Sequence, residues 1–199
     1  SIYLGIMDKA NDLYLGLNDM DILNTLDVSF FKDKTTYIES FDILVIDNNL
    51  SLEALQYLLI AFNHKKIIMD AVSAVKAVKL QELLPYISLL KLNVMELDAL
   101  SYKTSTSEKL NDLLMHGLSS VILTNSAQEI IYKSKTTQLA TMPKTVENIE
   151  NATGAGDAFL AGFIHGLLLE KSESECLNIG KETAYRCLQS PNSTIQKTY

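Results

Sequence analysis

The residues best suited to chemistry lie within positions 151–163, where Gly154, Ala155 and Gly156 precede an apolar segment with helical spacing. The first backbone N–H groups of a helix have no partner within it, and the helix dipole adds positive charge there. Glycine lets a ligand approach such a backbone closely, so this loop can hold an anion such as a phosphate. Asp157 follows at once and could take a proton from a hydroxyl. Together these residues favour phosphoryl transfer, although glycines also mark turns and aspartates also cap helices, so a structural role stays open.

The same run of residues resembles the second signature of the ribokinase-like (PfkB) family of sugar and nucleoside kinases, usually Asp-Thr-x-Gly-Ala-Gly-Asp before a helix. The resemblance implies that Asp157 is the catalytic base in contact with the acceptor, and that the backbone of Gly154–Gly156 is the anion hole. It also places Asn151 and Thr153 in the segment that binds a monovalent cation such as K⁺ in this family. Asn151 stands where the family usually has aspartate, and Ala152 where it has threonine, and these departures bear on cation binding more than on phosphoryl transfer.

The composition is that of one globular domain without the features of a nucleic-acid or membrane partner, and the resemblance implies a small-molecule substrate, a nucleoside or sugar, instead. The chain has 199 residues, of which 47% are hydrophobic and 21% charged, and this length can bury a sizeable core. Its formal net charge of −7 lacks the basic excess of a nucleic-acid surface, and no apolar run reaches the ~18–20 residues of a membrane span. Cys176 and Cys187 fall in one predicted helix, about 16 Å apart by helical rise and too far for a disulfide. We therefore expect a reduced, cytoplasmic setting.

Segments with strand-like and helix-like patterns alternate through the chain. Strands are predicted at 41–46, 66–69, 87–90 and 119–124, with a final pair at 129–132 and 137–141. Helices are predicted at 51–62, 73–84, 94–100, 107–115, 156–169 and 173–188, with Pro85 closing the second of them. Such alternation is typical of parallel strands joined by crossover helices, so we predict an α/β fold with a mostly parallel sheet covered on both faces. Small residues at 158, 162 and 166 predict close packing of their helix on that sheet.

Four polar residues fall at or just after predicted strand ends, namely Asp47, Asp70, Asn93 and Thr124. Ligands of α/β sheets bind beyond the carboxyl ends of the strands, so this shared placement predicts a site there. Polar residues also end strands for purely structural reasons, and that interpretation stays open for Asp70.

The amino-terminal segment differs from the rest of the chain. Residues 2–7 and 13–17 alternate around a turn-prone stretch at 8–12, which is typical of a β-hairpin. A lone hairpin is marginal in water, so it is expected to join other strands. By the resemblance, residues 1–25 are a remnant β-hairpin of the family's lid with its connection, and residues 26–199 are the nucleotide-binding core of a ribokinase-like three-layer α/β fold. Members of the family often pair through lid strands, which implies a homodimer through the unpaired edge.

Further stretches resemble the family in the same order along the chain. Asn93 and Glu96 fit its Asn-x-x-Glu motif, which implies that they organise Mg²⁺, largely through water, and the triphosphate of ATP. A single carboxylate is adequate because Mg²⁺ keeps several of its waters. Thr124 matches a threonine beside the nucleotide, although residues 125–128 replace the glycine-bearing loop that follows it in the family. Asn192 belongs to a stretch that resembles the loop closing over adenine and the cation.

The acceptor is the least determined part of the predicted function. Residues 18–22, 47–51 and 70–73 resemble these segments in the members of the family that phosphorylate pseudouridine, with Asn49 at a position that faces the sugar. An amide there could both donate to and accept from ribose hydroxyls. The leading hypothesis is an ATP-dependent kinase for the 5′-hydroxyl of pseudouridine. A kinase for another nucleoside or sugar and a non-catalytic nucleotide-binding or regulatory protein stay open, because the resemblance covers only the later part of the family's length and implies a truncated chain.

Overall fold

The computed structural model describes residues 1–7, 13–146 and 149–194, and within them it contains two β-sheets. The larger sheet has six strands in the order β3 (Ile43–Asp47), β4 (Lys66–Asp70), β5 (Leu89–Asn93), β6 (Ser120–Thr124), β7 (Ile130–Ser134) and β8 (Gln138–Thr141). Strands β3 to β6 are parallel, and β7 and β8 continue the sheet antiparallel. The predicted mostly parallel sheet is thus confirmed, and its four parallel strands bring their carboxyl ends to one edge.

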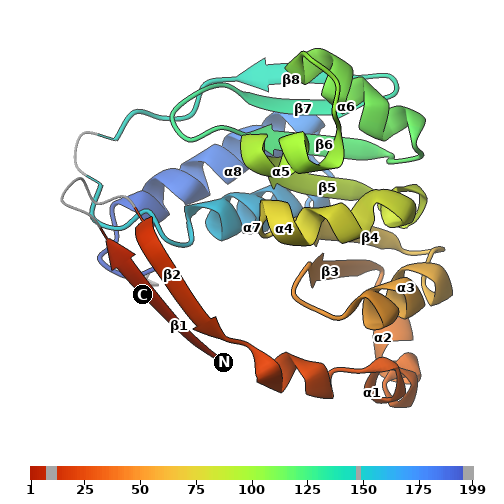
Figure 1. Ribbon diagram of the computed structural model, residues 1–199. Coiled ribbons are helices and arrows are strands. Elements are labelled where there is room, and N and C mark those ends of the chain that lie inside the picture. Colours follow the sequence, from red (N-terminus) through yellow and green to blue (C-terminus); the bar gives the residue numbers. More distant parts are fainter. Residues whose placement is uncertain (8–12, 147–148, 195–199) are drawn as a thin grey trace.

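Helices cover both faces of this sheet, as Figure 1 shows. One face carries α3 (Leu52–Ala61), α4 (Ala74–Ala77), the 3₁₀ helix η2 (Val78–Tyr86), α5 (Val94–Leu100) and α6 (Thr106–Met115). The other face carries α7 (Ala155–Leu168) and α8 (Glu173–Leu188). Side-chain oxygens of Ser51, Asn93, Ser105 and Ser172 accept an N–H from the first turn of α3, α5, α6 and α8 and so fix where these helices begin. The three-layer arrangement is therefore confirmed.

Two apolar cores hold the layers together because successive strand residues point to opposite faces. Ile67 and Met69 of β4 belong to the core beneath α3, α5 and α6. Ile68 between them belongs to the core beneath α7 and α8, where it meets Phe159 and Phe163. The same alternation directs Asp70, two residues after Ile68, toward the α7 side of the sheet.

Gly162 and Gly166 of α7 face α8, so the prediction that these two small residues pack on the sheet was wrong. A Cβ atom added to Gly162 would lie 2.9 Å from the carbonyl oxygen of Ile179 and would overlap the hydroxyl of Thr183. One added to Gly166 would lie 2.8 Å from the Sγ atom of Cys176. The missing side chains let the two helices approach closely, and α7 is anchored by α8 as well as by the sheet.

The largest differences between the predicted and observed elements lie in the part of the chain before β5. Residues 73–84 were predicted as one helix that Pro85 closes, but α4 is only one turn long and the 3₁₀ helix η2 follows, with Pro85 inside it. A proline ring clashes with the preceding turn of an α-helix, and tighter 3₁₀ turns avoid that contact. The strand predicted at 87–90 is instead β5, which carries Lys91 into the sheet. Three short helices, η1 (Asp21–Thr25), α1 (Val28–Asp33) and α2 (Thr35–Glu39), were not predicted.

The smaller sheet is the predicted hairpin, formed by β1 (Ile2–Met7) and β2 (Leu13–Asp19). It stands apart from the six-stranded sheet (Figure 1), and the turn predicted at 8–12 lies outside the described residues. Leu4 faces Leu17 and Ile6 faces Leu15 across the ribbon, and all four side chains are exposed. Among the helices that the structure describes, none has the length and apolar content to cross a membrane.

Candidate active site

Charged side chains form a row across three neighbouring strands at the carboxyl edge of the sheet. The register places Asp47 of β3 beside Asp70 of β4, and Asp70 beside Lys91 of β5. On the next strand pair, Asn93 lies beside Thr124. The predicted grouping of Asp47, Asp70, Asn93 and Thr124 at one edge is thus borne out by the strand register, and Lys91 is an addition to it.

Helix α7 begins above this row without a side-chain cap. Its N-cap residue is Gly154, with a left-handed φ of 86°, and no side-chain hydrogen bond caps the helix within the part of the chain that the structure describes. A Cβ atom on Gly154 would overlap the carbonyl oxygen of Ser193, so both the dihedral angle and the space require glycine here. The N–H groups of Gly156 and Asp157, in the first turn, have no acceptor within the helix. This end of α7 therefore has backbone N–H groups that could donate to an anion, and the anion hole at Gly154–Gly156 stays a prediction.

An ion pair lies directly beneath that first turn. Lys91 Nζ is 2.8 Å from Asp70 Oδ2, and both side chains are nearly buried. A Cβ atom added to Gly156 would lie 2.8 Å from the same Nζ atom. Asp70 uses its other oxygen, Oδ1, to accept the N–H of Val72 at 2.9 Å, which holds Val72 in a left-handed conformation with φ of 69°. Such a φ is strained for a β-branched residue, and strain of this kind clusters at functional sites.

Asp157 points into an open cavity of about 430 Å³ that Asp47 and Asp70 also line. The side chain keeps contact with solvent, yet nearby protein atoms partly desolvate it and raise the pKa of its carboxyl above the ordinary value. Repulsion from Asp70 and Asp47 raises this pKa further, and Lys91 lowers it. A carboxylate with a raised pKa is a stronger base, which suits proton removal from a hydroxyl.

Asn93 and Glu96 form a capping box at the start of α5. Glu96 Oε2 accepts the Asn93 N–H at 2.8 Å, Glu96 Oε1 accepts from Asn93 Nδ2 at 2.9 Å, and Asn93 Oδ1 accepts the Glu96 N–H at 3.0 Å. Glu96 is only 2% exposed, and burial raises its pKa although the Asn93 N–H lowers it. Lys91 also lowers this pKa and Asp70 raises it, so Glu96 is electrostatically coupled to the ion pair. Thr124 donates its hydroxyl to the carbonyl oxygen of Leu92 at 3.3 Å.

The segments implied for the monovalent cation and for adenine meet at the start of α7, where Cys187 Sγ donates to the carbonyl oxygens of Thr153 at 3.9 Å and Ser193 at 3.6 Å. Asn151 Oδ1 accepts the N–H of Thr153 at 2.8 Å, so this amide oxygen supports a local turn. The loop with Asn192 packs against Gly154 through Ser193, and Asn192 itself is exposed and donates its N–H to Ser190 Oγ at 3.2 Å. Among the described residues, no group of three or more His, Cys, Asp or Glu side chains could hold a metal ion.

Asn49 lies just after β3 with its amide already engaged. Its Nδ2 donates to Asp47 Oδ2 at 2.8 Å, its backbone N–H donates to Asp47 Oδ1 at 3.0 Å, and its Oδ1 accepts from Lys76 Nζ. Lys79 Nζ donates to the carbonyl oxygen of Leu50. The two lysines thus clamp this turn, and Asn49 orients Asp47 in the wall of the cavity that holds Asp157.

Lys91 is the residue that the sequence analysis missed. The predicted strand stopped at residue 90, which left Lys91 unassigned. The signal that could have found it is a single charge inside an otherwise apolar strand, two residues before Asn93 and on the same face as Leu89. A lysine in a strand that is buried on both faces needs a partner, and that requirement points to a site.

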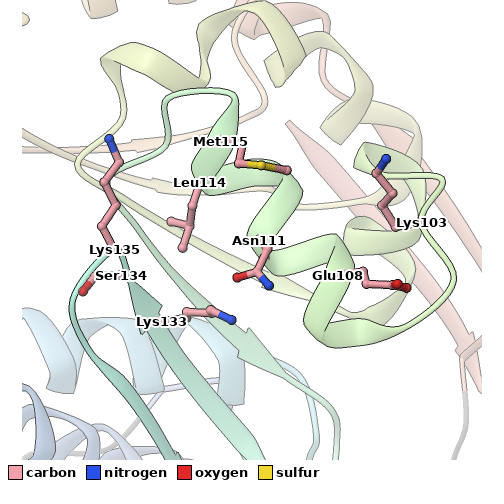
Figure 2. A pocket seen from close by; sticks show the side chains of 8 residues that line it. All are labelled: Lys103, Glu108, Asn111, Leu114, Met115, Lys133, Ser134 and Lys135. Carbon is pink, nitrogen blue, oxygen red and sulfur yellow. The ribbon is translucent and has the colours of Figure 1, made fainter.

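A second hollow, of about 760 Å³, lies between α6 and β7 and is shown in Figure 2. Three lysines line it, Lys103, Lys133 and Lys135, but its one carboxylate, Glu108, is held by Ser105 in the capping box of α6. The end of β7 that lines it pairs with the start of β6, at Ser120, so the hollow lies toward the opposite edge of the sheet from Thr124. It therefore belongs to a different part of the molecule from Asp157.

Comparison with known proteins supports the arrangement of the fold. The model of the pfkB family carbohydrate kinases matches residues 2–198. A pseudouridine kinase from Escherichia coli (strain K12) is 29% identical over 167 residues, which are 81% of this chain and 53% of that protein. The chain thus spans about half the length of the curated relatives it matches.

Solved structures show the same fold. A carbohydrate kinase from Agrobacterium tumefaciens, 29% identical, superposes with a TM-score of 0.79 over 96% of this chain and 63% of its own. A ribokinase from Arabidopsis thaliana, solved with ribose and ATP, is 19% identical and superposes with a TM-score of 0.73 over 82% of this chain and 55% of its own. The fold is ribokinase-like, and the chain belongs to the pfkB family of carbohydrate kinases.

Proposed function

We propose that this chain is the nucleotide-binding and catalytic part of an ATP-dependent kinase that phosphorylates the 5′-hydroxyl of pseudouridine. The observation that carries the proposal is the placement of Asp157, a carboxylate with a raised pKa, in the uncapped first turn of α7. A base for the hydroxyl and a backbone cradle for the phosphoryl group thus lie within one helical turn. A purely structural helix start has no need of either feature.

In the proposed reaction Asp157 takes the proton of the acceptor hydroxyl, and the oxygen of that hydroxyl attacks the γ-phosphorus of ATP. The new P–O bond forms, the bond from the γ-phosphorus to the β–γ bridging oxygen breaks, and ADP leaves. Charge on the moving phosphoryl group is proposed to be met by the backbone of Gly154–Gly156, in which Ala155 already donates its N–H to Ala152, together with the N–H of Asp157 and the positive end of the α7 dipole. Catalysis of this kind depends mainly on positioning and electrostatics, which rigid elements supply.

Glu96 fits the proposed role of holding Mg²⁺ through water. Its carboxylate is buried, and among the described residues it has no ion-pair partner to offset the cost of burial. Each oxygen accepts one hydrogen bond from Asn93 and keeps a lone pair for a water molecule on the metal. Mg²⁺, when bound, would neutralise part of the charge on the phosphates. Asn93, Thr124 and Asn192 are proposed to contact the nucleotide.

A monovalent cation such as K⁺ is proposed to sit beside the anion hole, at Asn151 and Thr153. The candidate ligands are the carbonyl oxygen of Thr153, which accepts a long bond from Cys187 Sγ at 3.9 Å, and the Oδ1 atom of Asn151, which brings no charge to the site. Among the described residues, Asn151 Oδ1 accepts the N–H of Thr153, and this leaves it a lone pair for a cation.

Pseudouridine is the proposed acceptor because of the 29% identity to the Escherichia coli pseudouridine kinase and the segments around Asn49 and Asp70. Asn49 is proposed to face the sugar, which requires its amide to exchange a contact with Asp47 or Lys76 for a ribose hydroxyl. A kinase for another nucleoside or sugar is the first alternative, since carbohydrate kinases of several kinds share this fold.

The test of the acceptor is a competition assay with pseudouridine, uridine and ribose under Mg-ATP. The products are identified by ³¹P NMR, on this chain and on any longer form of the protein. We expect pseudouridine 5′-phosphate as the dominant product. Preferential phosphorylation of ribose or uridine would overturn the proposed acceptor and leave the phosphotransferase role in place.

A non-catalytic nucleotide-binding protein is the second candidate function. The observation that favours it is the exposed loop 125–128, which replaces a glycine-bearing loop of the family next to Thr124. Nucleotide binding without turnover for any acceptor would support it.

The hairpin is proposed to pair with a second copy of the chain, because each of its two strands has an unpaired edge and its apolar face is exposed. Sedimentation velocity tests this, since a monomer at all concentrations would exclude the dimer.

A further inference from the structure

A buried ammonium group lies at the underside of the proposed anion hole. Lys91 is 9% exposed, and its Nζ atom is close enough to Gly156 that a methyl group on that residue would lie only 2.8 Å away. Lys91 projects from the middle strand of the parallel set, on the face that α7 covers. Only a glycine in the first turn of α7 leaves room for the ammonium group there.

The ammonium group has unused hydrogen-bonding capacity. Within residues 1–7, 13–146 and 149–194, its one hydrogen-bond acceptor is Asp70 Oδ2, at 2.8 Å. A lysine ammonium group carries three N–H donors, so two of them have no recorded partner although the side chain is nine-tenths buried. Besides its bond to Asp70, this ammonium group can therefore donate to an anion bound at the start of α7.

Two positive groups face each other across a short distance at this point. The N-terminus of α7 carries a partial positive charge, and Lys91 places a full positive charge against it. Asp70 offsets part of this repulsion from one side. An anion bound between the backbone N–H groups and Lys91 would interact favourably with both, and Asp157 lies in the same first turn, beside it.

We propose that Lys91 donates hydrogen bonds to oxygens of the phosphoryl group during transfer, so that the group is held between the α7 backbone and the ammonium group. This rests on the proposed function. Lys91 keeps all of its protons throughout, because the proton of the acceptor hydroxyl goes to Asp157 and the electron pair of the broken bond goes to ADP. Asp70 acts as a positioning residue that holds the ammonium group in place.

The alternative is that Lys91 only neutralises Asp70. Three variants separate the two roles: Lys91→Gln, Asp70→Asn, and both together. The double variant replaces the ion pair with two neutral amides that can still hydrogen-bond across β4 and β5, so it avoids an unpaired buried charge. Circular dichroism and thermal melting are measured first, to check that each variant is folded.

We expect Lys91→Gln and the double variant to lose kcat by about 10²–10³-fold, the scale for removal of one donor to a developing oxyanion, with a smaller change in KM for ATP. Asp70→Asn keeps the ammonium group and should lose much less. Recovery of activity in the double variant to the level of Asp70→Asn would show that Lys91 only neutralises Asp70. A loss in Asp70→Asn as large as that in the double variant would assign the effect to Asp70. Either result overturns the proposal.

A binding measurement separates this inference from the proposed function. Mg-ADP is titrated with and without tetrafluoroaluminate, a planar mimic of the phosphoryl group in transfer. We expect the wild-type protein to bind the ternary mimic more tightly than Mg-ADP alone, and Lys91→Gln to lose this gain while binding Mg-ADP unchanged. A Lys91-dependent gain in a chain that phosphorylates no acceptor would overturn the proposed function and keep the Lys91 contact. No gain in the wild-type protein would overturn the contact.

Discussion

Substitution of Gly154 by alanine probes how the anion hole is built. Gly154 adopts a φ of 86°, and a left-handed backbone costs a residue with a Cβ atom about 1–2 kcal/mol. The new methyl group would also overlap the carbonyl oxygen of Ser193, and overpacking of this kind costs about 1–3 kcal/mol. Both effects act at the junction of α7 and the loop at residues 190–194, so we expect the free energy of unfolding to fall by about 2–5 kcal/mol.

The assay is thermal unfolding followed by circular dichroism. For a chain of this size each kcal/mol corresponds to about 2–4 °C, so the melting temperature should fall by roughly 4–20 °C. Gly156→Ala is the matched control. Its Cβ atom would meet only the flexible end of Lys91, and alanine is favoured over glycine within a helix by up to about 1 kcal/mol. We expect Gly156→Ala to keep its melting temperature and to lose phosphoryl transfer, because its methyl group displaces the ammonium group of Lys91.

Two results would refute this reasoning. A Gly154→Ala protein with the same melting temperature as the wild-type protein would show that neither the dihedral angle nor the space at this position affects stability. A Gly156→Ala protein that melts as low as Gly154→Ala would show that Lys91 cannot move aside and that the two glycines share one structural role.

Three further predictions concern Glu96, Gly162 and Asp157. Burial raises the pKa of Glu96 above 4.5, so the stability that its protonated form contributes at low pH is lost as the pH rises through the raised pKa. Glu96→Gln should therefore gain stability relative to wild type as the pH rises above about 4.5, measured by urea unfolding with EDTA. A difference in stability that does not depend on pH would contradict this. Gly162→Ala should lower the free energy of unfolding by about 1–2 kcal/mol through its clash with Thr183 and Ile179, and the loss should shrink when Thr183→Ala is also present; equal losses in both backgrounds would exclude that contact. The acid limb of kcat/KM should have its midpoint above 3.8, since Asp157 must be ionised to act as a base and its pKa is raised, and a midpoint at or below 3.8 would assign the limb to another group.

The helices that frame the anion hole could be predicted closely because local signals agree there. Gly154 marks the turn, and α7 and α8 then begin within one residue of the predicted positions. The Ser172 side chain accepts the N–H of Glu175, and the Glu175 side chain accepts the N–H of Ser172. The Ser-x-x-Glu spacing of this capping box can be identified from the sequence alone. Here capping, periodicity and glycine placement all favour the same helix bounds, and the tertiary contacts do not change them.

The parts that could not be predicted have two causes, a local effect of Pro85 and contacts between distant residues. Residues 73–84 have helical periodicity, and the local effect of Pro85 divides them between α4 and a 3₁₀ helix. The engagement of the Asn49 amide by Lys76, 27 residues away, has no local signature. Neither has the contact between Lys91 and Gly156, which exists only because β5 lies beneath the start of α7. Sequence spacing predicted the start of α7, whereas the charged side chains near it could be found only from the sheet.

The most direct test of the proposed function compares phosphoryl transfer from Mg-ATP to pseudouridine by the wild-type protein and by Asp157→Asn. Both proteins are first shown to melt cooperatively and to bind Mg-ATP. We expect the wild-type protein to release ADP in step with pseudouridine 5′-phosphate, and Asp157→Asn to lose kcat by about 10²–10⁴-fold, the usual scale for a general base. Turnover by Asp157→Asn at the wild-type rate would contradict the role of Asp157 as the base and, with it, the proposed mechanism.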